Sequence, residues 1–259
     1  MNHVAAVNGK ELAHDARLPP GGTSVVLDTV RITRWMWVAT FAIIDFGVFR
    51  IAFINQIGAE TSWGALRFFD LDKELSLPAW YSSILLWSTA IVLATNATLA
   101  RRLDRRTAFY WWSLSVVFVY LSIDEMTSIH EFGNLLLPPD YKFTGFLTFS
   151  WVVVAAPLLI VGGLAFLPFL FRLPRSTALV IGLAGLVYVG GAFGMELVGG
   201  YFSKARDSIE YQLAVITEEG LELVGLSIFL MVLLNFLATE SRSPLQRMAA
   251  RQVARPDAL

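Results

Sequence analysis

Seven ionisable side chains lie within or at the ends of stretches that are otherwise apolar. They are Asp124, Glu125, His130, Glu196, Glu218, Glu219 and Glu222. Carboxylates combined with an imidazole suit hard or borderline divalent ions. An ionisable residue inside a membrane span is energetically costly and by default indicates a functional site. The residue types therefore predict a metal site within an apolar chain.

Each of the seven residues receives a role in this hypothesis. One or two divalent ions (iron, manganese or zinc) are expected to be held by five ligands, namely Asp124, His130, Glu196, Glu219 and Glu222. Glu125 or Glu218 would then act as the general base on a metal-bound water, whose pKa the ion lowers. Two carboxylates about 5 Å apart repel by about 3 kcal/mol at an effective dielectric near 20. The cluster therefore needs a metal ion, shared protons or Arg50 to neutralise it.

The composition indicates a membrane protein. Of the 259 residues, 56% are hydrophobic and 16% are charged, and the apolar residues gather in blocks of about 20–25. A soluble domain carries about 25% charged residues. There is no cysteine, which excludes disulfides and thiolate metal sites. The net charge of −1 gives no basic field for a nucleic-acid partner.

The apolar blocks predict an all-α protein, a bundle of six transmembrane helices in the plasma membrane. The expected helices span residues 33–55, 79–100, 108–132, 147–171, 177–201 and 211–239. The transmembrane domain would cover 31–239, between a flexible cytoplasmic tail (1–30) and a basic cytoplasmic tail (240–259). One side of this arrangement holds 14 of the 20 basic residues, so the positive-inside rule places both termini in the cytoplasm.

The acids are expected to meet near the extracytoplasmic surface. At about 1.5 Å per residue, Glu218–Glu222 lie roughly 10–17 Å below it, and Asp124 and Glu196 roughly 8–12 Å below it. In the expected helix 108–132, Asp124, Thr127, Ser128 and Glu131 share one face. Three separate helices would thus line one outward-facing chamber.

Two further segments bear on the chamber. The loop 69–80 carries three acids and lies on the same side, either as a solvated loop, which we favour, or as a lid. Gly190-x-x-x-Gly194 favours close packing of its helix against a neighbour, which would bring Glu196 toward the interior.

Three functions remain open at this stage. The first is a divalent-metal-dependent membrane enzyme that hydrolyses or oxidises a lipid or another apolar small molecule. The second is a proton- or cation-coupled transporter in which the same acids titrate. The third is a non-catalytic subunit whose acids bind a partner protein. The inner half of the expected spans carries no charge, which favours a closed-bottom site over an ion path. The sequence leaves the metal, the substrate and the oligomeric state open.

Overall fold

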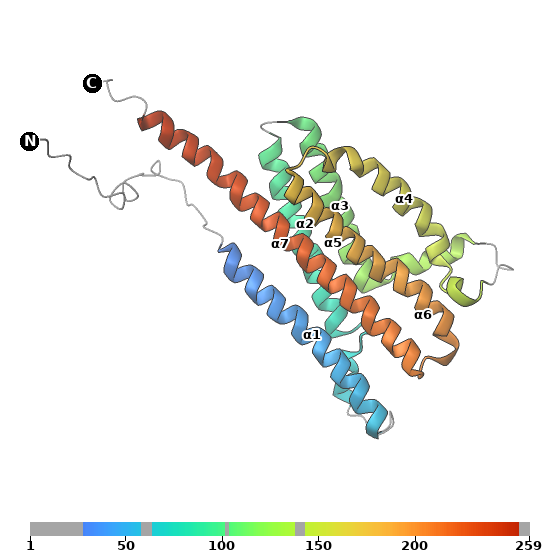
Figure 1. Ribbon diagram of the computed structural model, residues 1–259. Coiled ribbons are helices and arrows are strands. Elements are labelled where there is room, and N and C mark those ends of the chain that lie inside the picture. Colours follow the sequence, from blue (N-terminus) through green and yellow to red (C-terminus); the bar gives the residue numbers. More distant parts are fainter. Residues whose placement is uncertain (1–27, 58–63, 102–103, 138–142, 254–259) are drawn as a thin grey trace, which may run out of the picture. The chain divides into compact units, whose positions relative to one another are not determined.

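The computed structural model describes residues 28–57, 64–101, 104–137 and 143–253, and in these ranges the protein is helical without any strand (Figure 1). The α-helices are α1 (Thr29–Ile57), α2 (Leu77–Ala100), α3 (Arg105–Thr127), α4 (Trp151–Leu170), α5 (Arg175–Val189), α6 (Glu196–Phe202) and α7 (Ile209–Val253). The short elements are the 3-10 helices η2 (Gly64–Phe69), η3 (Ile129–Leu136), η4 (Gly145–Leu147) and η6 (Ser203–Ala205), and the π-helix η5 (Gly190–Met195).

Two compact units divide the chain. Thr29–Leu237 forms the helical bundle, and Met1–Asp28 with Ala238–Leu259 forms the other unit. In the second unit, α7 continues as a helix to Val253, within the expected basic tail 240–259. Of the expected tail 1–30, residues 1–27 lie outside the described part of the chain, and α1 begins at Thr29. All that follows concerns the bundle.

Among the residues that the structure describes, five helical segments are long and apolar enough to cross a membrane. They are Thr29–Gln56, Leu77–Ala100, Trp151–Leu170, Arg175–Ala205 and Ile209–Glu240. Helix α3 is of similar length, at 23 residues, but it is interrupted by serine, tyrosine and tryptophan, which lower its hydropathy.

Helix α3 nevertheless runs antiparallel beside α2 along its length. The Ser122 hydroxyl donates to the carbonyl of Ser83 at 2.9 Å, and the Ser115 hydroxyl donates to the carbonyl of Ala90 at 2.9 Å. The contact residue in α2 moves toward its C-terminal end as the contact residue in α3 moves toward its N-terminal end. The two helices are therefore antiparallel and lie in the same layer. We call the end where α2 begins and α3 ends the acidic end, and the opposite end the arginine end.

Local capping fixes where these two helices begin. Ser76 caps α2, because its hydroxyl accepts a hydrogen bond from the backbone N–H of Ala79 at 3.2 Å, and proline follows in the first turn. Asp104 caps α3 by accepting from the backbone N–H groups of Arg106 and Thr107. The α2–α3 pair is therefore a helical hairpin with defined ends.

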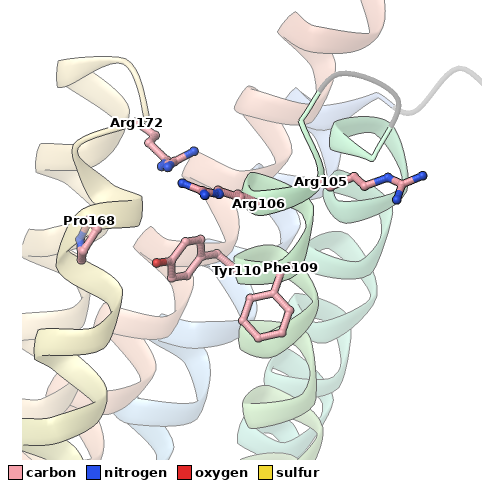
Figure 2. Close-up of a pocket in the computed structure, with 6 residues that line it drawn as sticks. All are labelled: Arg105, Arg106, Phe109, Tyr110, Pro168 and Arg172. Atoms are coloured by element: carbon pink, nitrogen blue, oxygen red, sulfur yellow. The ribbon is translucent and has the colours of Figure 1, made fainter.

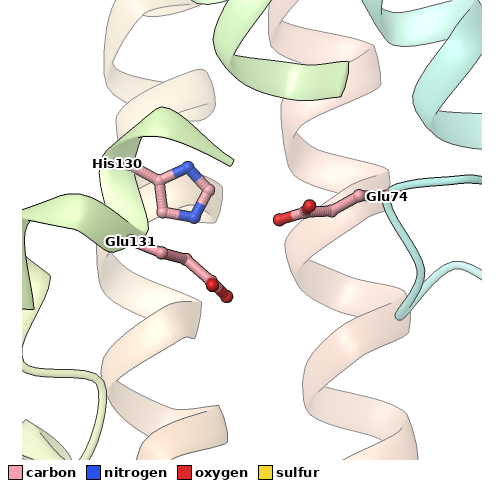
Figure 3. Close-up of side chains that lie close together, drawn as sticks. All are labelled: Glu74, His130 and Glu131. Atoms are coloured by element: carbon pink, nitrogen blue, oxygen red, sulfur yellow. The ribbon is translucent and has the colours of Figure 1, made fainter. Parts of the chain in front are cut away.

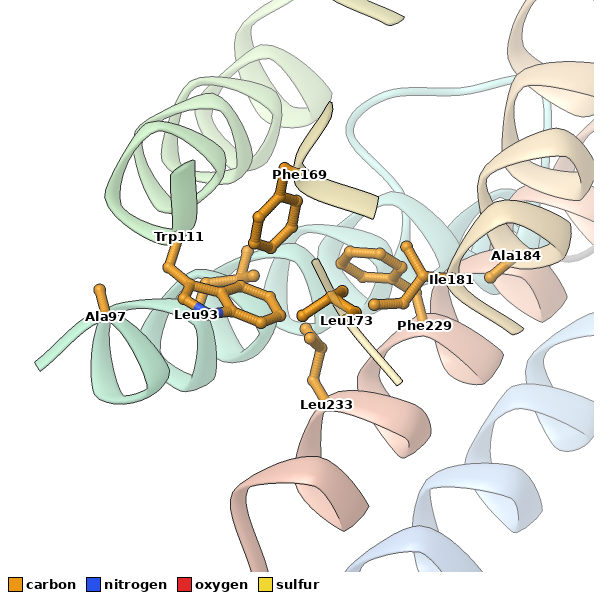
Figure 4. Close-up of a cluster of buried hydrophobic side chains, with 9 residues drawn as sticks. All are labelled: Leu93, Ala97, Trp111, Phe169, Leu173, Ile181, Ala184, Phe229 and Leu233. Carbon is orange, nitrogen blue, oxygen red and sulfur yellow. The ribbon is translucent and has the colours of Figure 1, made fainter. Parts of the chain in front are cut away.

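Helix α7 forms the centre of the bundle. In its most apolar stretch of 18 residues, 50% of the residues are buried, compared with 11% in α1 and 11% in α4. It contributes to all three buried clusters, of which the largest joins five helices (Figure 4). That cluster consists of Leu93, Ala97, Trp111, Phe169, Leu173, Ile181, Ala184, Phe229 and Leu233. The helix that carries Glu218, Glu219 and Glu222 is thus the one most enclosed by its neighbours.

Glycines let α7 approach the α5–α6 segment at backbone distance. A Cβ atom on Gly225 would lie 2.6 Å from the backbone nitrogen of Tyr188. A Cβ atom on Gly191 would lie 2.7 Å from the carbonyl oxygen of Glu218 and 2.9 Å from Cγ of Glu222. Gly191 lies in the π-helix η5, which interrupts the span between α5 and α6. Such π-helical turns occur frequently at functional sites.

The substitution Gly191→Ala is expected to destabilise the bundle by about 1–3 kcal/mol, because the methyl group has no room against α7. Thermal unfolding of the detergent-solubilised protein would show this as a lower midpoint. Gly190→Ala is the matched control, since nothing lies within 4 Å of its Cβ position. Equal midpoints for the two variants would contradict the close approach.

Candidate functional site

Asp124 forms the hydrogen bonds that end helix α3 at the acidic end. Ser128 takes a left-handed conformation (φ 53°), and its backbone N–H donates to the carbonyl of Asp124 at 2.8 Å. The Asp124 carboxylate accepts from the backbone N–H of His130 at 2.6 Å and from Nδ1 of His130 at 3.0 Å. The expected helix 108–132 is therefore wrong beyond Thr127. Glu131 does not share a helical face with Asp124, because the carboxylate turns the chain back on itself.

His130 is oriented by these contacts. Asp124 accepts from Nδ1, so in the neutral ring the lone pair lies on Nε2. The ring centroid lies 4.7 Å from that of Trp151, and 28% of the side chain is exposed. A histidine held by a carboxylate through one nitrogen is the arrangement that metal-ligating histidines adopt.

Glu74, His130 and Glu131 form a compact group at the acidic end (Figure 3). One ligand atom from each residue lies within 4.8 Å of the other two, which is close enough for a single ion to be bound by all three. Among the described residues this is the group of three or more acids and histidines that is compact enough to hold a metal ion. His130 comes from η3, as does Glu131, and Glu74 precedes α2.

The charges of this group favour a cation. Burial and the neighbouring carboxylates of Glu131 and Asp124 raise the pKa of Glu74. Burial lowers the pKa of His130, but the hydrogen bond to Asp124 and the negative charges of Glu74 and Glu196 outweigh it and raise the pKa above its ordinary value. Burial is the largest cause of the Glu74 shift, and neighbouring carboxylates contribute to both shifts; a bound cation would offset their negative charge.

The loop before α2 is bound to the bundle. Asp70 accepts from Nη2 of Arg50 at 2.6 Å, and both side chains are mostly buried. Asp72 accepts from the hydroxyl of Tyr211 on α7 at 2.7 Å. Leu71 is buried against Gly47 of α1. The solvated loop that we favoured from the sequence is therefore wrong, and these contacts fix the position from which Glu74 extends.

Arg50 serves this loop. The sequence left it as one of three means of neutralising the buried acids, but its charge pairs with Asp70. Asp45, on the same helix, is exposed on the outside of the bundle. Helix α1 therefore contributes to the acidic end through the loop that it holds.

Further carboxylates lie between the group of Glu74, His130 and Glu131 and the centre of the bundle. Glu125 accepts a hydrogen bond from the buried hydroxyl of Ser82 and lies within electrostatic range of Glu74 and His130. Glu219 and Glu222 of α7 lie within electrostatic range of Glu125. The acids of α3 and of α7 therefore face a common region.

The segment around η5 closes this region on another side. Glu196, the first residue of α6, accepts a hydrogen bond from the indole Nε1 of Trp151 at 2.9 Å. Its carboxyl group also lies close to that of Glu218 on α7. The Trp151 ring also contacts the His130 ring. Trp151 and Glu196 therefore connect the group of Glu74, His130 and Glu131 to α7.

The five ligands and two bases expected from the sequence fall into two sets, one around His130 and one on α6 and α7. Asp124 supports His130 through Nδ1, and Glu125 lies below them. The remaining acids form the layer on α6 and α7, which comprises Glu196, Glu218, Glu219 and Glu222. Sequence reasoning missed Glu74 and Glu131 as partners of His130. The available signals were the three acids of the loop 69–80 and the adjacency of Glu131 to His130.

The fold and this end of the bundle define a class of protein: an all-helical, apolar bundle suited to a membrane, with a carboxylate- and histidine-lined end. A family model described as "Domain of unknown function (DUF8692)" matches residues 38–236, so the chain belongs to that family. No curated protein and no solved structure matches it. The matched range includes every acid and histidine of the acidic end.

Arg50→Met is expected to destabilise the protein by about 3 kcal/mol, because it leaves the Asp70 carboxylate buried without its partner. Chemical or thermal unfolding in detergent measures the loss. The double variant Arg50→Met/Asp70→Asn should regain most of it, since no unpaired charge remains. A double variant as unstable as Arg50→Met would show that the pair does not hold the loop.

Proposed function

We propose that the chain is a six-span membrane protein of the plasma membrane, with both termini in the cytoplasm and the acidic end facing outward. The antiparallel pairing of α3 with α2 supports a sixth span, because α3 passes through the same layer as a helix that is apolar enough to cross. The asymmetry of basic residues supports the orientation.

The acidic end, in this proposal, binds a divalent cation such as iron, manganese or zinc through Glu74, His130 and Glu131. The observation that carries the proposal is the orientation of His130: Asp124 occupies Nδ1, which leaves Nε2 for an ion beside two carboxylates. Three protein ligands with an open position are typical of catalytic metal sites, whereas structural sites are closed.

The function that this arrangement supports best is a metal-dependent enzyme acting on a lipid or another apolar small molecule. A bound cation would supply Lewis acidity or an activated water. Glu125 would act as general base in this enzyme, and its proximity to Glu74 and His130 and its contact with Ser82 support that role. A site among membrane helices suits an apolar substrate that arrives through the bilayer.

The deeper acids support a second candidate function, a cation- or proton-coupled transporter. Glu219 and Glu222 lie on the central helix of the bundle, beyond the group of Glu74, His130 and Glu131, and Glu218 lies close to Glu196. Chains of carboxylates within spans are typical of proton relays. In the enzyme, the same acids would line the chamber and set its charge.

Metal analysis of the purified protein, washed with chelator and reloaded, tests the proposed site. The wild type is expected to retain about one ion per chain, and His130→Ala and Glu74→Gln should lose it, since each removes a ligand. Asp124→Asn should weaken binding by about 10–100-fold, because it removes the group that orients His130.

Two further variants complete the design. Glu210→Gln changes an exposed acid at the start of α7 and is the matched control, which should bind as the wild type does. Glu219→Gln/Glu222→Gln should also retain the ion if Glu74, His130 and Glu131 hold it. A wild type without stoichiometric metal would overturn the enzyme, and uptake into liposomes that is lost in Glu219→Gln/Glu222→Gln would support the transporter.

The topology is tested by single cysteines, which the cysteine-free chain accepts without background. A membrane-impermeant maleimide applied to intact cells should label Leu75→Cys and Lys204→Cys and spare Arg101→Cys, since all three positions are exposed. If α3 did not cross, Lys204→Cys would instead be protected like Arg101→Cys. This one position therefore distinguishes six spans from five.

A further inference from the structure

A pocket of about 490 Å³ lies at the arginine end, between the start of α3 and the end of α4 (Figure 2). It is lined by Arg105, Arg106, Phe109, Tyr110, Pro168 and Arg172. Helix α3 separates it from the acidic end by its 23 residues, about 33 Å. The pocket is thus independent of the proposed metal site.

Positive charge dominates the pocket. The guanidinium groups of Arg106 and Arg172 point toward one another across it, from α3 and from the segment after α4 (Figure 2). The acid beside them is Asp104, which accepts from Nη1 of Arg172 at 3.0 Å. Its hydrogen bond from the Thr107 hydroxyl, together with those from the backbone of α3, lowers the pKa of Asp104. Arg105 points away from the other two arginines (Figure 2), and Asp104 compensates the charge of Arg172, so one positive charge remains between Arg106 and Arg172.

The guanidinium groups of Arg106 and Arg172 face one another, and Asp104 compensates only one of the two charges, so an anion between them would be stabilised. Two guanidinium groups offer forked donors that match the oxygens of a phosphate. Tyr110 forms the floor of the pocket below them, stacked on Phe169 at 5.3 Å. The polar part of the pocket therefore suits a phosphate monoester or diester.

The apolar part of the pocket distinguishes a lipid from a free phosphate. Phe109 is 68% exposed beside the arginines, and Phe171, next to Arg172, is 86% exposed. Large aromatic side chains exposed at the end of an apolar bundle are typical of the membrane interface, where one side of the ring contacts acyl chains. A ligand that fills both parts has a phosphate and an apolar tail.

We propose that this pocket binds the headgroup of an anionic phospholipid, with the phosphate between Arg106 and Arg172 and an acyl chain along Phe109. Basic pockets between membrane helices bind such headgroups. The proposal requires the bundle to lie in a bilayer, and it does not depend on a metal at the acidic end.

Titration of the full chain in a neutral detergent with short-chain phosphatidylglycerol, and separately with short-chain phosphatidylcholine, tests the proposal. Phosphatidylglycerol should bind more tightly, and Arg106→Gln/Arg172→Gln should weaken its binding at least about tenfold. The matched control is Arg101→Gln/Arg175→Gln, which removes two exposed arginines at the same end that do not line the pocket. This control should change the affinity less than about twofold.

Several outcomes would overturn the proposal. Equal weakening by the two double variants would indicate general electrostatic attraction, and equal binding of the two lipids would show that the headgroup charge is not recognised. Inorganic phosphate that displaces the lipid at equal concentration would identify a free-phosphate site. Should Arg106→Gln/Arg172→Gln fail to fold, Arg106→Lys/Arg172→Lys keeps the charge but loses the forked donors, and an unchanged affinity there would contradict a phosphate between them.

Discussion

Repulsion between carboxylates held close together among apolar helices is the constraint on which the acidic end depends. Near the ends of the helices, cationic or imidazole partners compensate the carboxylate charges: Arg50 pairs with Asp70, and His130 pairs with Asp124. Deeper in the bundle, neutral groups donate hydrogen bonds to the carboxylates: the hydroxyl of Ser82 to Glu125 and the indole of Trp151 to Glu196. In the described part of the chain, no ion pair joins an arginine or lysine to Glu218, Glu219 or Glu222 of α7, so protons or an added cation must compensate for their charge.

The most enclosed helix, α7, carries three of the acids of the acidic end, Glu218, Glu219 and Glu222. Helix α7 packs against α5 and η5 through glycine contacts that leave no room for a side chain. Glu218 and Glu222 are only partly exposed, so the interactions between their charges are stronger than at an open surface. Packing and electrostatics are coupled here, because a looser bundle would admit water and weaken the site.

The sequence predicted the helices well and the site in part, for different reasons. Apolar blocks of membrane length are a strong signal, and five of the six expected spans match apolar helices within a few residues. The early end of α3 was missed because periodicity does not show that Asp124 bonds the backbone of His130. The role of Glu74 was missed because it depends on Arg50 and Tyr211, which bind its loop from distant parts of the chain.

The π-helix η5 makes the position of Glu196 depend on chain length as well as on residue type. A π-helical turn corresponds to one residue more than an α-helix would use, and each residue turns an α-helix by 100°. Deleting a single residue between Gly190 and Met195 would allow regular α-helical bonding and rotate Glu196 relative to Gly191. Insertions and deletions in this turn are therefore far less tolerable to the protein than substitutions such as those at Gly194, where open space surrounds the chain.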